Sequence, residues 1–499
     1  MDKPNILIIM ADQLTPFMTG FYGNNQVKTP NLDKLCSESA RFDNAYTPYP
    51  LCTPARAALM TGKYCYNLGC YDNATPFSSD EPTFAHYLTV NGYETVLSGK
   101  MHFIGPDQLH GFHRRFTTDI YPSGFNWNPS FIDKENHLMR GKGIAAGYVE
   151  AGMGPKEWNI GLQHDKETHF RALEYLYTKG GGGGAKKQRQ PFCLCVSYHH
   201  PHDPFNPPQK YWDMYRDAPM DIPEINEAVL NSYTTLDKWL NNGFHRNDLD
   251  DITGEQNLLK LRRCYAALVT YVDDLVGELL DALEYAGMDK NTVIIFTTDH
   301  GDMLGERGMV QKRCFYEWSA KIPMLLKMPD GSLAGKQCAA PASLIDICPT
   351  LREITGESGV TGYPAVDGVS LLDVLGGKHE DRVIFSEGHG EGVVSPVFMA
   401  KSKKYKYMHF HQNQIENMLF DVESDPREKN NLNASPEYAG VASMLRESIL
   451  ARFSPEKVQA ELDKKIPERQ LILEAMRLSG TKWDYTPEFP GSGRYVRGK

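Results

Sequence analysis

Four short apolar segments, each followed at once by polar side chains, constrain the fold of this chain most strongly. They are residues 6–10, followed by Asp12 and Gln13; 94–97, followed by Lys100 and His102; 192–196, followed by His200 and His202; and 292–296, followed by Asp299 and His300. Continuous apolar runs of this length are typical of strands buried on both faces of a parallel sheet. The carboxyl ends of such strands meet at one edge of the sheet, so we expect these polar groups to share one site.

Helical patterns between these segments define the fold class. Apolar residues recur at spacings of three and four from Leu261 to Gly287, where Gly287 suits a helix C-cap. Alternation of helix and strand predicts an α/β fold with a large, doubly wound, mostly parallel sheet flanked by helices. Residues 396–401 and 405–410 indicate short antiparallel strands instead. We therefore expect a main α/β domain over residues 1–385 and a smaller C-terminal α+β subdomain over residues 386–499.

Composition excludes two classes of partner and indicates a compartment. The 499 residues carry 53 basic and 63 acidic side chains, a net charge of −10, which argues against binding of nucleic acid. No run of 18 apolar residues occurs, so we expect no membrane-spanning segment. The first apolar run is too short for a signal peptide, and the ten cysteines lack zinc or CxxC spacing. These features predict a cytoplasmic protein with reduced thiols.

The segment from Cys52 to Gly62 carries the sharpest local signal. Pro54 suits the first turn of a helix, which places Cys52 at the helix N-terminus and Arg56 on the same face. Unpaired N–H groups at a helix N-terminus favour an anion, and an electropositive helix end is expected to lower the pKa of a thiol. The alternative is a buried cysteine that only packs beside a capped helix.

Cys-x-Pro-x-Arg followed by Ala-x-Leu-x-Thr-Gly resembles the signature of the formylglycine-dependent sulfatases, which belong to the alkaline phosphatase superfamily. The resemblance implies that a formylglycine-generating or sulfatase-maturing enzyme oxidises Cys52 to formylglycine. The hydrate of that aldehyde would then be the nucleophile, and one of its oxygens would bind a divalent cation. Gly99-Lys100-Met101-His102 resembles a second motif of the same family, Gly-Lys-x-His.

The same resemblance implies a metal site formed by Asp12, Gln13, Cys52, Asp299 and His300. The family usually has Asp-Asp and Asp-Asn or Asp-Gln at the two pairs, so this chain departs from it at Gln13 and His300. Two carboxylates suit a hard cation, for which Ca²⁺ is our expectation. The imidazole also accepts Mn²⁺, and Mg²⁺ is a further candidate. The alternative for each aspartate is capping of the helix that follows its strand.

Positive groups complete an expected anion site. Side chains at i and i+2 of an extended segment point the same way, so Lys100 and His102 can face one ligand. The resemblance implies that His202, with His200 as the alternative, and Lys312 belong to the same site. In the implied mechanism His202 or Lys312 protonates the departing alcohol, and His102 removes a proton from the hemiacetal so that sulfate leaves. The expected ring of positive groups is Arg56, Lys100, His102, His202 and Lys312.

Residues 98–112 and 300–308 are most similar to bacterial choline sulfatases, a branch of this family. This similarity implies that the substrate is choline-O-sulfate and that the protein is a homo-oligomer, a dimer or a tetramer. A quaternary ammonium binds best to aromatic faces with a carboxylate, here Trp127 and Glu387. Asn73 is expected to contact the ester oxygens.

Three other functions stay open at this point. One is a sulfatase for a carbohydrate or aryl sulfate, with the same catalytic core and a different substrate pocket. Another is a phosphonate or phosphodiester hydrolase, although such relatives generally lack the Gly-Lys-x-His motif. The last is a sulfatase-like binding protein whose Cys52 stays unmodified.

Overall fold

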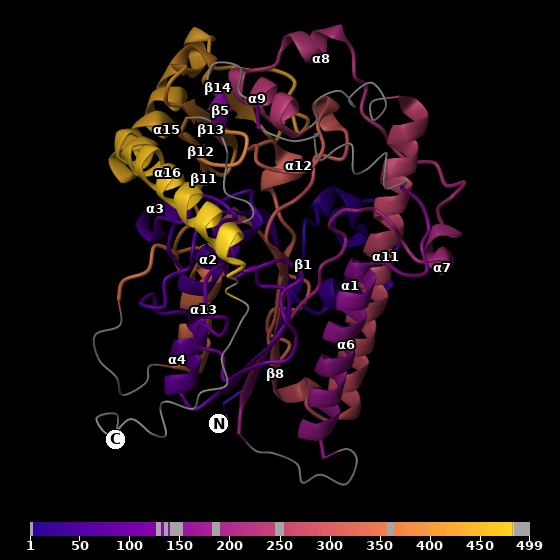
Figure 1. Cartoon of the computed structure of the whole chain (residues 1–499). Coiled ribbons are helices and arrows are strands. Elements are labelled where there is room, and N and C mark those ends of the chain that lie inside the picture. Colours follow the sequence, from indigo (N-terminus) through magenta and orange to yellow (C-terminus); the bar gives the residue numbers. More distant parts are fainter. Residues whose placement is uncertain are drawn as a thin grey trace, which may run out of the picture.

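The computed structural model contains one large sheet flanked by helices and a smaller antiparallel sheet beside it (Figure 1). The residues that it describes are 3–125, 131–133, 138–139, 153–181, 190–244, 254–356, 364–393, 395–481 and 483. Figure 1 shows the large sheet between two groups of helices, and the small sheet at one end of it. The predicted fold class is confirmed.

The large sheet has eight strands in the order β10-β2-β9-β8-β1-β7-β3-β4. Every pairing is parallel except the two made by β9. The register places Ala11 of β1 opposite Thr298 of β8, so Asp12 and Asp299 leave the sheet side by side. The strands are β1 (Asn5–Ala11), β2 (Ala40–Tyr46), β3 (Glu94–Gly99), β4 (Arg114–Arg115), β7 (Phe192–Ser197), β8 (Thr292–Thr298), β9 (Met324–Lys327) and β10 (Gln337–Ser343).

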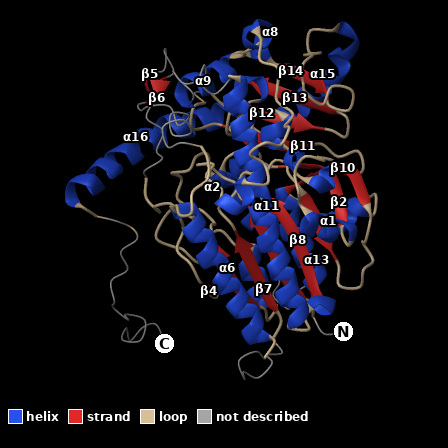
Figure 2. Ribbon diagram, turned by 90° about the vertical axis from the view of Figure 1, so that its right-hand side faces the viewer, coloured by secondary structure: helices blue, strands red, loops and turns tan. Residues whose placement is uncertain are grey.

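Strand β1 explains why the apolar runs are continuous. Leu7 and Ile9 belong to the core on one face of the sheet, and Ile6 and Ile8 to the core on the other. Helices α6 (Ile160–Lys179) and α11 (Glu255–Tyr285) cover the first face, while α2 (Cys52–Thr61), α4 (Phe84–Val90) and α13 (Ile347–Thr355) cover the second (Figures 1 and 2). The long helix expected from Leu261 is α11, which begins six residues earlier.

The second sheet has four antiparallel strands in sequence order, β11 (Ile384–Gly388), β12 (Val397–Lys401), β13 (Tyr405–Phe410) and β14 (Met418–Asp421). Strands β12 and β13 confirm the two predicted from the sequence. Strand β11 crosses position 385, at which the sequence analysis divided the chain. The helices α15 (Ala439–Arg452) and α16 (Pro455–Ser479) follow the sheet.

Shorter elements complete the described chain. They are α1 (Pro30–Ser37), α3 (Cys65–Leu68), α7 (Gln209–Trp212), α8 (Glu227–Asn231), α9 (Thr235–Phe244), α12 (Glu317–Ala320), α14 (Leu371–Leu375) and the pair β5 (Phe131–Asp133) and β6 (Leu138–Met139). All ten cysteines lie in the described residues as free thiols. None of the helices in the described ranges combines the length and the apolar character needed to cross a lipid bilayer.

Candidate active site

Arg56 joins the strand ends at the centre of the site. Its Nε donates to Asp299 at 2.9 Å and its Nη2 donates to Asp12 at 2.7 Å, and all three side chains are fully buried. Its Nη1 donates to the carbonyl of Lys100 at 2.7 Å and to Ser197 Oγ at 2.9 Å. The guanidinium therefore holds the ends of β1, β3, β7 and β8 together, and its described hydrogen bonds all go to protein groups.

Cys52 is the first residue of α2 and is buried. Its Sγ lies 3.2 Å from His300 Nε2 and 3.9 Å from Lys100 Nζ. Burial, with the Asp12 charge, raises the pKa of the thiol to about 12, although Lys100 and Lys312 act in the opposite direction. The expectation of a lowered thiol pKa is wrong because the helix end lies inside the protein. The unmodified thiol is therefore protonated at neutral pH and is a poor nucleophile.

Four residues form a group that could hold a metal ion. One ligand atom from each of Asp12, Cys52, Asp299 and His300 lies within 4.8 Å of the others. Asp12 Oδ2 accepts a hydrogen bond from Arg56 and lies 2.7 Å from Lys100 Nζ, whereas Asp12 Oδ1 is buried and has no hydrogen-bond partner in the described part of the chain. An unpaired, buried carboxylate oxygen is costly unless a cation binds it. The residues present thus fit a divalent cation.

The protonation states of Asp12 and His300 also suit a bound divalent cation. Burial would raise the pKa of Asp12, but the charges of Lys100 and Arg56 hold it well below its usual value. Burial lowers the pKa of His300 to about 4 despite the charge of Asp299. A charged carboxylate and a neutral imidazole are the forms that bind metals.

Gln13, the remaining metal-ligand candidate, is occupied by other partners. Its backbone is left-handed, and its N–H donates to Asp299 Oδ1 at 3.1 Å. Its side-chain oxygen accepts a hydrogen bond from Lys312 Nζ, and its amide nitrogen donates to Asp203 and Asp302. A role for Gln13 as metal ligand stays a prediction.

His202 and Lys312, which the family resemblance assigned to one site, lie in contact. Lys312 Nζ lies 2.9 Å from His202 Nε2, and His202 Nδ1 lies 2.7 Å from the carbonyl of Asp203. The carbonyl requires a proton on Nδ1, so Nε2 accepts from the lysine. Burial and the Lys312 charge hold the pKa of His202 well below its usual value. His200 instead pairs with Asp165, at 2.6 Å between Nδ1 and Oδ2.

His102 is buried, and none of the described residues pairs with either of its ring nitrogens. Asp119 accepts hydrogen bonds from the backbone N–H groups of Met101 and His102, at 3.0 and 2.5 Å, and His102 is left-handed. Burial and the Lys100 charge lower the pKa of His102 to about 3. The ring is therefore a neutral base with free nitrogens at physiological pH.

Comparison with known proteins identifies the family. A family model described as "Sulfatase" matches residues 4–357, and a model of the C-terminal part of N-sulphoglucosamine sulphohydrolase matches residues 305–454. The chain belongs to the sulfatase family. This sulfatase is 37% identical to the choline-sulfatase of Rhizobium meliloti (strain 1021), over 99% of this chain and 96% of the relative. It is 29% identical to an arylsulfatase of Clostridium perfringens, over 90% and 94% of the two chains.

Solved structures share the fold of the sulfatase. A phosphonate monoester hydrolase of Agrobacterium radiobacter has a TM-score of 0.70 at 24% identity, covering 92% of this chain and 96% of that one. A protein solved in complex with its substrate D-glucosamine-2-N,6-O-disulfate has a TM-score of 0.69 at 24% identity, covering 93% and 98%. At this identity the likeness establishes the fold alone. The sulfatase is a sulfuric ester hydrolase of the alkaline phosphatase superfamily.

Of the three residues expected to contact the substrate of the sulfatase, the structure places one beside Cys52. Asn73 Oδ1 accepts a hydrogen bond from the backbone N–H of Thr53, next to Cys52, at 2.9 Å. Glu387 is buried, and its carboxylate contacts the N–H of Tyr66 at 3.0 Å and His389 Nε2 at 3.1 Å, so the structure does not bring it to Cys52. Trp127 lies outside the described residues.

Several residues near the site of the sulfatase were not identified from the sequence. Lys100 Nζ lies 4.5 Å from the ring centroid of Tyr121, and the ring of His199 lies 4.9 Å from that of His202. Glu391, rather than Glu387, contacts Asn73, and its Oε2 lies 2.8 Å from Arg313 Nη2. His199 could have been noticed beside His200. No sequence pattern indicated that Glu391 and Arg313 would meet.

Proposed function

We propose that this sulfatase hydrolyses choline-O-sulfate to choline and sulfate, using formylglycine made from Cys52 and a divalent cation. Similarity over 99% of the chain to a relative named choline-sulfatase carries the choice of substrate. The cation, which we propose to be Ca²⁺, would be held by Asp12, Asp299, His300 and the modified residue 52. Bound there, the aldehyde hydrate supplies the oxygen nucleophile and the cation stabilises negative charge.

The state of Cys52 supports the modification. A thiol with a pKa of about 12 provides almost no thiolate at neutral pH, so the unmodified residue is ill suited to attack sulfur. The surrounding positive charges suit a bound sulfate ester nonetheless. Lys100 Nζ lies 3.9 Å from the sulfur of Cys52, and its contact with Asp12 at 2.7 Å holds it in place. A fixed charge of this kind stabilises a transition state without reorganisation.

Proton transfer is assigned to two groups of this chain. The pair formed by Lys312 and His202 would protonate the departing choline oxygen, because Lys312 carries donors and lies 2.9 Å from a histidine that can share its proton. His102 would remove the proton that allows sulfate to leave, since neither ring nitrogen has a partner among the described residues and the unprotonated one can accept a proton.

Sulfate release from matched esters tests the substrate. The protein is expressed with a formylglycine-generating enzyme, and release is measured from choline sulfate, 4-nitrophenyl sulfate, glucosamine 6-sulfate and a phosphonate monoester. We expect the highest kcat/KM with choline sulfate. Turnover of the sugar sulfate without choline sulfate would instead favour a carbohydrate sulfatase, in line with the match to the N-sulphoglucosamine sulphohydrolase model.

Mass spectrometry and metal analysis test the two cofactors. The peptide containing Cys52 should lose sulfur and react as an aldehyde, whereas a fully unmodified, active protein would reject formylglycine. Chelation should abolish turnover, and Ca²⁺ should restore more of it than Mn²⁺ or Mg²⁺. Recovery with Mn²⁺ alone would reject calcium.

A single variant tests the proposed recognition of choline. Trp127→Ala should raise KM for choline sulfate much more than KM for 4-nitrophenyl sulfate, because only choline carries a quaternary ammonium. Equal losses for both esters would reject the aromatic cage. Homo-oligomeric assembly and a cytoplasmic location stay predictions. Analytical ultracentrifugation can test the assembly.

A further inference from the structure

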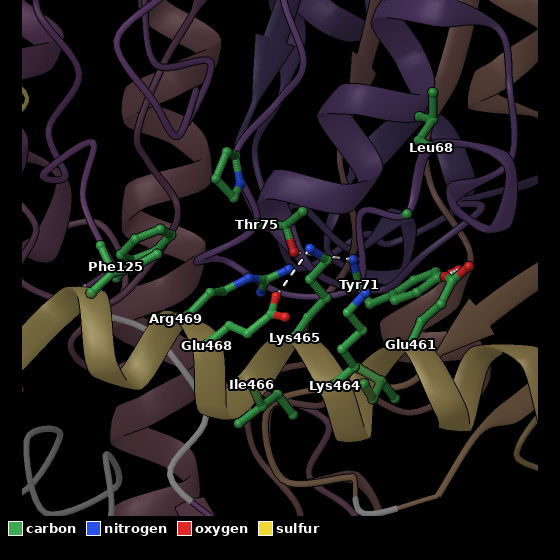
Figure 3. Close-up of a pocket in the computed structure, with 14 residues that line it drawn as sticks. Leu68, Tyr71, Thr75, Phe125, Glu461, Lys464, Lys465, Ile466, Glu468 and Arg469 are labelled. Carbon is green, nitrogen blue, oxygen red and sulfur yellow. Dashed lines mark hydrogen bonds and ion pairs between the residues drawn. The ribbon is translucent and has the colours of Figure 1, made fainter.

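Helix α16 contacts the loop that carries Asn73 through two polar links. Arg469 Nη1 lies 2.9 Å from both carboxylate oxygens of Asp72, and the hydroxyl of Tyr71 donates to Glu461 at 2.8 Å. Asp72 is fully buried and Arg469 is 9% exposed. Figure 3 shows Arg469 reaching from α16 toward the segment that carries Thr75, with Glu461 meeting Tyr71 further along the helix.

Asp72 also determines the shape of this loop. Its Oδ1 accepts hydrogen bonds from the backbone N–H of Ala74 and from the hydroxyl of Thr75, both at 2.9 Å. The same carboxylate therefore folds the loop over residues 71–75 and pairs with α16. Removing the arginine would leave a buried carboxylate without a counter-charge, which a protein avoids by rearranging.

Asn73 stands between this carboxylate and the reacting residue. Its Oδ1 accepts the N–H of Thr53 in the first turn of α2, at 2.9 Å, and its own backbone N–H donates to Glu391 at 2.8 Å. Because the helix uses the side-chain oxygen, the amide nitrogen is the group left to donate to a ligand. Its contact with Glu391 Oε2 is 3.5 Å, at the limit of a hydrogen bond.

Apolar packing and polar links both hold the loop against α16. Tyr71 of the loop and Leu462 of the helix belong to one buried hydrophobic cluster, and Ile466 packs against it. A pocket of about 620 Å³ also lies between the two segments, lined by Ile466 and Ile472 of the helix and by Tyr71, Thr75 and Phe125 (Figure 3). Of these links, the pair formed by Arg469 and Asp72 is the one that reaches the carboxylate next to Asn73.

We propose that Arg469 is a positioning residue for substrate binding. Through Asp72 it holds Asn73 so that the amide nitrogen donates to an oxygen of the bound sulfate ester. The proposal rests on residue 52 being the reacting group, as set out under the proposed function, but on neither choline nor calcium. The C-terminal helix thus contributes to a site whose other groups come from the ends of the large sheet.

Steady-state kinetics of three variants test this role. Arg469→Met removes the charge and keeps the length of the side chain, and it should raise KM about tenfold with kcat within twofold. Arg469→Lys should recover most of the loss because it keeps a charge near Asp72. The control is Lys464→Met: Lys464 lines the same cavity from the same helix, but in the described contacts it pairs with neither Asp72 nor Tyr71. The control should match the wild type, and equal KM values for Arg469→Met and the control would overturn the proposal.

A double-mutant cycle separates positioning from general damage. If Arg469 acts through Asn73, the double variant Asn73→Ala/Arg469→Met should have the same KM as the single variant Asn73→Ala. If the increases in KM of the two single variants multiply in the double variant, Arg469 does not act through Asn73. Formylglycine content is measured for each variant, and the ester is whichever of choline sulfate and 4-nitrophenyl sulfate the wild type hydrolyses faster, so a wrong choice of choline leaves the test intact. If Arg469→Met does not fold, Arg469→Gln, which also removes the charge, enters the same cycle.

Discussion

Two buried groups of charges in this protein differ in how completely they are paired. Beneath the second sheet, Lys406 Nζ lies 2.8 Å from Glu317 Oε1, 2.5 Å from Glu428 Oε1 and 2.7 Å from the carbonyl of Phe315, although the contact with Glu428 Oε1 is an ion pair without a hydrogen bond. Around the active site, Asp12 Oδ1 and both ring nitrogens of His102 have no hydrogen-bond partner among the described residues. A saturated group, in which each charge lies beside an opposite charge, joins elements of structure, whereas buried polar atoms without a partner are available to a ligand.

The backbone does not follow the same division. Lys406 and Glu317 lie within the regular elements β13 and α12. Glu428 of the same group is left-handed, as are Gln13 and His102 of the active site, and this conformation costs free energy for residues other than glycine. The pairing of the charges, rather than the backbone conformation, therefore distinguishes the two groups.

The variant with the largest expected effect disrupts the active site and leaves the rest of the fold intact. Cys52→Ala should lower kcat/KM at least about 10⁴-fold, because it removes the residue that becomes the nucleophile. Its free energy of unfolding should change by less than about 1 kcal/mol, since alanine is small and suits a helix. Sulfate release and urea unfolding measure the two effects. A comparable loss of stability would mean that Cys52 is mainly a packing residue.

The complementary variant, Lys406→Met, breaks the saturated group. It leaves Glu317 and Glu428 buried without their shared cation, which should cost about 3–5 kcal/mol of unfolding free energy. Activity per folded molecule should stay near that of the wild type, because Lys406 does not reach the active site. Urea unfolding, with kcat corrected for the folded fraction, provides the measurement. A large fall in the corrected kcat would contradict the division of roles.

His102→Leu should impair activity and leave stability nearly unchanged, which is the reverse of Lys406→Met. The loss of activity should be smaller than for Cys52→Ala. The loss of the base should lower kcat about 10²- to 10³-fold. The free energy of unfolding should stay within about 1 kcal/mol of the wild type, because the substitution removes two buried nitrogens for which the described residues offer no partner. Activity and thermal unfolding are measured together, and a strongly destabilised variant would show that the imidazole is a structural group.

The sequence predicted the elements whose evidence is local. The apolar runs define β1, β3, β7 and β8, and parallel pairing then brings Asp12, Lys100, His202 and Asp299 to one edge. Burial was harder to anticipate, because it depends on helices far away in the chain. For that reason the pKa of Cys52 was expected to fall although it rises.

Long-range contacts set a second limit to prediction. Arg56 was expected to face the substrate, and no spacing in the sequence reveals that its donors bind Asp12, Asp299 and Lys100. The contact between Glu391 and Asn73 spans 318 positions and depends on a left-handed residue at 391. Such pairs follow from tertiary packing, which periodicity and motifs do not encode.

The last prediction concerns the pH dependence of the saturated group. Burial raises the pKa of Glu428 to about 7 despite the charge of Lys406, and the Glu317 carboxylate adds to the rise. The folded protein therefore keeps this proton up to about pH 7, whereas the unfolded chain loses it near pH 4.5. Ionisation in this window favours the unfolded chain, so the contribution of Glu428 to stability falls as the pH rises from 4.5 to 7.

Glu428→Gln tests this dependence, because the amide cannot ionise. Relative to the wild type, the variant should gain about 1 kcal/mol or more in unfolding free energy between pH 5 and pH 8. Urea unfolding at the two pH values gives the difference, and kcat per folded molecule should be the same in both proteins. Parallel stability profiles would mean that Glu428 is already ionised at pH 5, and that Lys406 neutralises both carboxylates rather than one.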